Sequence, residues 1–97
     1  MSDDLQSELA VVRQQIDSVD RQLLELLNQR ARHAQQVGEI KARHGEAGFI
    51  YRPEREAQVL QRIQESNPGP LSNESVTWFF REVMSACLSL EQPLGIA

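Results

Sequence analysis

Apolar side chains recur at steps of three and four residues through the first half of the chain, a spacing typical of one face of an α-helix. The positions are Leu5, Leu9, Val12, Ile16, Val19, Leu23, Leu26, Leu27, Ala34, Val37 and Ile40. No proline precedes Pro53 and the first glycine is Gly38, so the pattern predicts one uninterrupted helix from about residue 5 to about residue 43. We expect the segment HGEAG at residues 44–48 to end it.

Two shorter helices are predicted in the second half of the chain. Pro53 suits the first position of a helix that we expect to run to about residue 65. The segment SNPGP at residues 66–70 should interrupt it, and Ser72 is a candidate N-cap for a third helix to about residue 91. No stretch shows a strand pattern, so the predicted fold class is all-α with three helices.

The predicted first helix is long for the size of the chain. The sequence has 97 residues, which suits a single domain over residues 1–97. A helix of about 39 residues is roughly 58 Å long, whereas a compact chain of this size has a radius of gyration of about 12 to 13 Å. Two short helices cannot cover such a stripe, so the sequence predicts a homodimer in which a second copy lies alongside.

Composition narrows the class of protein further. The formal net charge of -4 argues against a general nucleic-acid partner, which would need an excess of cations. A single cysteine, Cys87, excludes an intramolecular disulfide, and the acidic residues 1–9 lack the apolar run of a signal peptide. No stretch approaches the roughly 20 apolar residues of a membrane span. We therefore expect a cytoplasmic protein without a membrane or nucleic-acid partner.

Basic side chains fall within the apolar stripe of the first helix. In helical projection Arg30 lies within about 20° of Leu23 and Val37, and Lys41 lies about 20° from Arg30. We therefore expect Arg30 and Lys41 to share a buried seam. Arg13 projects about 100° from Arg30, on the flank of the stripe, from which it could reach the site of a partner subunit.

The two shorter helices add further charges next to apolar positions. Arg55 and Glu56 lie beside the inward line of the second helix, and Glu91 projects within about 40° of Cys87 on the third. Taken together with Arg13, Arg30 and Lys41 of the first helix, the cations near apolar positions outnumber the carboxylates by four to two. A small dicarboxylate bound between them would supply the missing negative charge.

A simpler interpretation needs no ligand. Long side chains can extend from an apolar seam to water, and Arg30 could pair with Glu25 or Glu39. His33 and His44 lack metal-ligand spacing with a cysteine or a second histidine, so no metal is expected.

Three segments of the chain resemble the helical chorismate mutases of the AroQ class. VRQQIDSVDRQLLELLNQRARHAQQVGEIK resembles the first helix of that family, YRPERE the start of the second, and FFREVMSACLSLEQPL the third. The chain is most similar to the mutase domain that precedes prephenate dehydratase in the bifunctional members. The resemblance implies conversion of chorismate to prephenate in phenylalanine and tyrosine biosynthesis, and a covalently following dehydratase domain in the native protein. It also implies an intertwined homodimer whose two sites are each completed by an arginine of the other subunit.

The resemblance assigns roles to individual residues. Arg13 resembles the arginine that crosses into the partner's site, and Arg30 and Arg55 resemble the residues that hold the substrate carboxylates. Lys41 resembles a donor to a carboxylate and to the ether oxygen of the substrate. Glu56 resembles the acceptor for the ring hydroxyl.

Three positions depart from the best-known bacterial pattern of the family. Cys87 replaces a serine near a substrate carboxylate, and a thiol is a weak donor. Glu91 replaces a glutamine that faces the ether oxygen, and Arg52 replaces an acidic residue at the hydroxyl end of the pocket. We expect Cys87 and Arg52 among the substrate-binding residues and Glu91 among the catalytic ones.

The implied reaction is a unimolecular rearrangement that needs no nucleophile, metal or cofactor. Clamping two carboxylates selects the reactive conformer, and a donor at the ether oxygen stabilises the charge that grows there. We therefore expect Arg30→Ala and Lys41→Ala each to lose orders of magnitude in rate. An ionised Glu91 would repel the growing charge and a protonated one could donate to it, so turnover should rise with acidity.

Two other functions fit the same pattern. An isochorismate pyruvate lyase would share the fold and the cationic pocket but release salicylate. A non-catalytic helical dimerisation or regulatory module would tolerate neutral replacements of Arg30 and Lys41.

Overall fold

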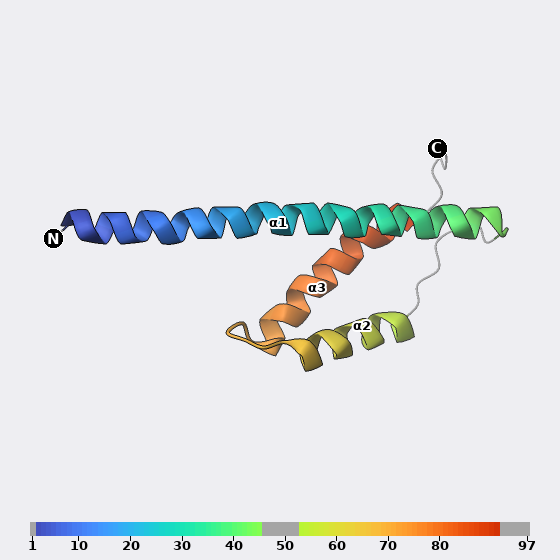
Figure 1. The fold of residues 1–97 in the computed structure, drawn as a ribbon. Helices are drawn as coiled ribbons and strands as arrows, with labels where there is room; N and C mark the ends of the chain where they lie inside the picture. Colours follow the sequence, from blue (N-terminus) through green and yellow to red (C-terminus); the bar gives the residue numbers. More distant parts are fainter. Residues whose placement is uncertain (1, 46–52, 92–97) are drawn as a thin grey trace. The chain divides into compact units, whose positions relative to one another are not determined.

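A computed structural model describes residues 2–45 and 53–91 of the chain (Figure 1). Its elements are α1 (Ser2–Arg43), α2 (Pro53–Ser66), α3 (Asn73–Leu88) and the 3-10 helix η1 (Ser89–Glu91). No strand occurs within these ranges, so the all-α class with one long and two shorter helices is confirmed. The third α-helix ends earlier than the predicted position near residue 91, and a 3-10 turn continues it.

The transition from α3 to η1 has a local cause. The hydroxyl of Ser89 donates to the carbonyl of Ala86 at 2.9 Å. A serine side chain that bonds to a nearby backbone carbonyl competes with the regular helical pattern, and a tighter last turn is common at helix ends. Glu91 therefore lies on η1 rather than on the regular face of α3.

α1 is a 42-residue helix with acidic residues in its first turn and a glycine shortly after its last residue. Asp3 and Asp4 lie in its first turn, where negative charge is favourable. At the other end the amide of His44 donates to the carbonyl of Ile40 at 3.2 Å, and Gly45 takes a φ of 81° in the left-handed region that glycine adopts readily. Among the described residues neither α1 nor any other helix is apolar enough over a sufficient length to cross a membrane.

The predicted breaker at residues 66–70 forms the connection between α2 and α3. The amide group of Asn67 donates to the carbonyl of Leu71 and to Oδ1 of Asn73, both at 2.8 Å, and its own oxygen accepts the backbone amide of Gly69 at 3.1 Å. Gly69 has a φ of 77°, which requires the freedom of a glycine. One asparagine side chain thus closes the turn.

Ser72 is the N-cap of α3, as the sequence predicts. Its hydroxyl oxygen accepts the backbone amide of Ser75 at 3.1 Å, and its carbonyl accepts the amide of Val76 at 3.0 Å. A hydrogen bond of 2.7 Å from the amide nitrogen of Gln64 to the hydroxyl of Thr77 links α2 to α3.

The chain divides into two compact units, residues 1–30 and residues 31–97. Among the described residues the buried hydrophobic ones are Ala34, Leu60, Val76 and Cys87, which all belong to the second unit. In the first unit the apolar stripe stays between 50% and 54% exposed at Leu5, Val12, Ile16, Val19 and Leu23. The stripe that the sequence pattern predicts is therefore present but uncovered over most of its length.

Candidate active site

Two predicted catalytic residues meet at the end of α1. Nζ of Lys41 donates to Oε1 of Glu91, which η1 carries, across 3.3 Å. The side chains of Lys41 and Glu91 are 19% and 25% exposed, so the ion pair is partly buried. Within the described ranges no other salt bridge forms.

The backbone of η1 reaches α1 at Gly38, one turn before Lys41. Gly38 is buried, and a Cβ atom built on it would lie 2.7 Å from the carbonyl oxygen of Glu91. Sequence reasoning treated Gly38 only as a late interruption of the helical pattern and missed this contact. The signal was there, because glycine in a helix interior is disfavoured against alanine by roughly 0.5–1 kcal/mol and often marks close packing.

The structure does not bring the remaining predicted site residues into contact with this pair through hydrogen bonds or ion pairs among the described residues. Arg13 and Arg55 are exposed, Arg30 and Glu56 are half-buried, and Cys87 is a buried free thiol. Arg52 lies outside the described residues.

In the single chain the seam around Arg30 and Lys41 is open to water. No charged side chain within the described ranges is fully buried, and both Arg30 and Lys41 are half-buried. The physical reason is the state of the stripe around them, because Leu23 is 50% and Val37 38% exposed. A seam that is itself open to water cannot bury its charges.

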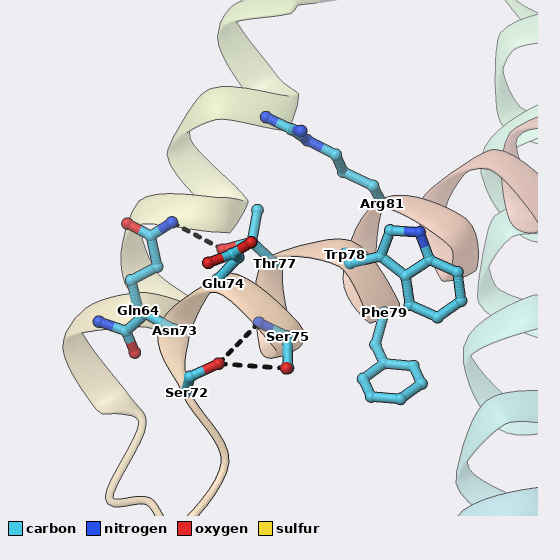
Figure 2. Close-up of a pocket in the computed structure, with 9 residues that line it drawn as sticks. All are labelled: Gln64, Ser72, Asn73, Glu74, Ser75, Thr77, Trp78, Phe79 and Arg81. Atoms are coloured by element: carbon cyan, nitrogen blue, oxygen red, sulfur yellow. Dashed lines mark hydrogen bonds between the residues drawn. The ribbon is translucent and has the colours of Figure 1, made fainter.

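A separate pocket lies where α2 meets the start of α3, and Figure 2 shows its lining. Gln64 and Thr77 satisfy one another there, while the rings of Trp78 and Phe79 lie 5.1 Å apart in an edge-to-face arrangement on the other side. The side chain of Arg81 extends away from both rings. None of the predicted site residues lines this pocket, so we do not assign the reaction to it.

The histidines have ordinary surroundings where the structure describes them. Nδ1 of His33 shares a hydrogen bond of 2.8 Å with Oε1 of Gln36 on the exposed side of α1. In the described part of the chain, no group of three or more His, Cys, Asp or Glu residues is placed to hold a metal ion.

The fold and the pair at Lys41 define an all-helical protein with an ammonium and a carboxylate held together beside a close helix contact. The profile of the family described as chorismate mutase type II matches residues 12–92, and the chain belongs to this family.

Two curated relatives are similar over almost the whole chain. The bifunctional chorismate mutase/prephenate dehydratase of Pseudomonas aeruginosa is 54% identical over 95% of the chain, and that of Neisseria gonorrhoeae is 52% identical over 100%. The chain spans 26% of the length of each. Among solved structures, a chorismate mutase (form II) from Thermus thermophilus matches 87% of this chain and 93% of its own, with 33% identity and a TM-score of 0.79.

Proposed function

We propose that the chain rearranges chorismate to prephenate without a cofactor. One observation carries the proposal: in a member of the chorismate mutase type II family, Oε1 of Glu91 lies 3.3 Å from Nζ of Lys41 and fixes the position of this ammonium group. A donor fixed in advance does not have to reorganise when negative charge develops on the ether oxygen, and this is how such a group lowers a barrier. The longer relatives join a prephenate dehydratase to the mutase, and we propose the same arrangement, in the cytoplasm, for the native protein.

The proposed substrate-binding roles of the remaining site residues follow from their charges. Arg30 and Arg55 hold the two carboxylates of chorismate, with Arg52 and Cys87 nearby, and Glu56 accepts the ring hydroxyl. Bidentate guanidinium contacts fix a carboxylate in orientation as well as position, so they select the compact conformer that reacts.

Glu91 has two roles in this scheme. In the structure its Oε1 accepts a hydrogen bond from Nζ of Lys41. When the substrate brings its own oxygens to Lys41, a proton on Glu91 would change this side chain from an acceptor into a second donor to the ether oxygen. Glu91 is therefore well placed to orient Lys41 and, once protonated, to donate to the ether oxygen beside it.

We further propose that the working form is an intertwined homodimer with shared sites. The apolar stripe of α1 is half exposed from Leu5 to Leu23, which favours burial against a second copy of the same helix. Arg13 is exposed on the same helix, and we assign it to the site of the partner subunit.

Loss of chorismate absorbance with purified protein tests the activity. Lys41→Ala should reduce kcat by about 10²–10³-fold, because a single preorganised donor of this kind contributes that much. Arg62→Ala, which removes an exposed cation from α2, is the matched control and should leave the rate unchanged. Chorismate that decays only at the buffer rate, or salicylate formed from isochorismate instead, would reject the proposal.

Mixed dimers test the shared site. Arg13→Ala chains and Lys41→Ala chains are inactive separately in this scheme, whereas a dimer with one of each has one intact site. Refolding them together in equal amounts should therefore recover about a quarter of the wild-type activity, since half of the dimers are mixed and each has one of two sites. If Arg13 served its own subunit, no site would be intact and no activity would return.

A further inference from the structure

We propose that Gly38 is a positioning residue for the catalytic pair: by lacking a side chain, it lets the backbone of η1 lie directly on α1 and so brings Glu91 to Lys41. The inference rests on the proposed function only in taking that pair as catalytic. The contact itself is a property of the fold.

The approach at Gly38 leaves no space for a side chain. A Cβ atom there would lie 2.7 Å from the carbonyl oxygen of Glu91, 3.0 Å from its carbonyl carbon and 3.1 Å from its Cα. All three are backbone atoms, so no side-chain rotation can relieve the overlap. Either η1 or the end of α1 would have to move.

Backbone conformation does not explain the glycine. The described glycines with positive φ are Gly45 and Gly69, so Gly38 has a φ that any residue adopts. It lies inside α1, where alanine forms a helix more readily. The close approach of Glu91 is therefore the feature of the structure that requires glycine at this position.

The displacement that a methyl group at Gly38 would cause is large enough to break the hydrogen bond between Lys41 and Glu91. Glu91 Oε1 is 3.3 Å from Lys41 Nζ, near the upper limit for a hydrogen bond. Lengthening the 2.7 Å approach to the 3.4 Å of ordinary contact moves the backbone of Glu91 by several tenths of an ångström. Because Gly38 and Lys41 are neighbours on one face of α1, this movement withdraws the carboxylate from the ammonium group.

Gly38→Ala is the direct test. We expect kcat for chorismate to fall by about tenfold to 10²-fold, as misplacement on the ångström scale does, with a smaller change in KM. Ala42→Gly is the matched control, because it makes the reverse exchange at an exposed position of α1 and should leave kcat unchanged. Circular dichroism verifies that both variants keep their helices.

Glu91→Asp separates position from packing. It withdraws the carboxylate by one methylene group and leaves Gly38 and its backbone contact untouched. We expect it to reproduce the loss of kcat seen in Gly38→Ala, and it remains informative even where Gly38→Ala folds poorly. Full activity in Glu91→Asp would overturn the proposal, because the position of the carboxylate would then be unimportant.

A readout that does not depend on turnover completes the test. A double-mutant cycle with Lys41→Ala and Glu91→Ala, measured by urea unfolding, should show coupling between the two residues in the wild-type background and none in the Gly38→Ala background. If the wild type fails to convert chorismate but this difference is found, the proposed function is lost and the positioning role stands. Coupling of equal size in both backgrounds would refute the positioning role.

Discussion

Leu23 offers a quantitative test of the dimer, because it lies in the stripe of α1 that a second copy should cover. Its side chain is 50% exposed in the single chain. Burying a whole leucine stabilises by about 1.5–3 kcal/mol, so covering the remaining half contributes about 1 kcal/mol per chain. Two-fold symmetry makes each substitution act twice, and Leu23→Ala should therefore weaken the dimer by about 2 kcal/mol, or roughly 30-fold in Kd.

Sedimentation velocity over a dilution series measures this change directly. One chain has a mass of 11.0 kDa, and we expect the wild type to sediment at twice that mass. Glu25→Ala is the matched control, since Glu25 projects about 160° away from Leu23, outside the apolar stripe. Where the wild-type dimer is too tight to dilute apart, the concentration dependence of its urea midpoint gives the same quantity.

The reasoning fails on either of two results. A wild-type chain that stays at the mass of one copy at every concentration has no partner for its stripe. Equal effects of Leu23→Ala and Glu25→Ala would show that the apolar face is not what holds two copies together.

Three further predictions concern stability and pH. Leu60→Ala should lower the free energy of unfolding by about 2–5 kcal/mol in urea titrations, because Leu60 is 8% exposed in the core of the second unit; a loss within error would show that this core contributes little. Ser72→Ala should lower the same free energy by about 1 kcal/mol, since the hydroxyl of Ser72 caps the amide of Ser75; Ser72→Asp should restore it. Turnover should rise as the medium becomes more acidic in the wild type and be independent of pH over the same range in Glu91→Gln; parallel profiles would remove Glu91 from the mechanism.

The helices could be predicted because their causes are local. Stepwise apolar spacing along α1, the proline at the start of α2 and the serine cap of α3 each act over a few residues. The early end of α3 was missed, since it depends on a side-chain hydrogen bond of Ser89 that no periodic pattern records.

The site was less accessible to sequence reasoning because its contacts are distant in the chain. Helical projection placed Lys41 on the apolar stripe, but its pairing with Glu91 spans 50 positions, and no periodic pattern records a direct contact at that range. Gly38 and Glu91 are similarly far apart in the sequence, and the only sign of their contact in the sequence is a glycine inside a helix. The roles of Arg13, Arg30 and Arg55 stay predictions.

The distribution of burial links the stability of this chain to its proposed chemistry. In the described part of the chain the buried hydrophobic residues are Ala34, Leu60, Val76 and Cys87, and no side chain is less than 2% exposed. So small a core gives little margin over the conformational entropy lost on folding, whereas the half-exposed stripe of α1 offers the larger apolar area. Covering that stripe with a second copy would stabilise the fold and place Arg13 in the opposite site at the same time. Folding, assembly and catalysis should then share one dependence on chain concentration, and dilution that lowers helicity should lower turnover in parallel.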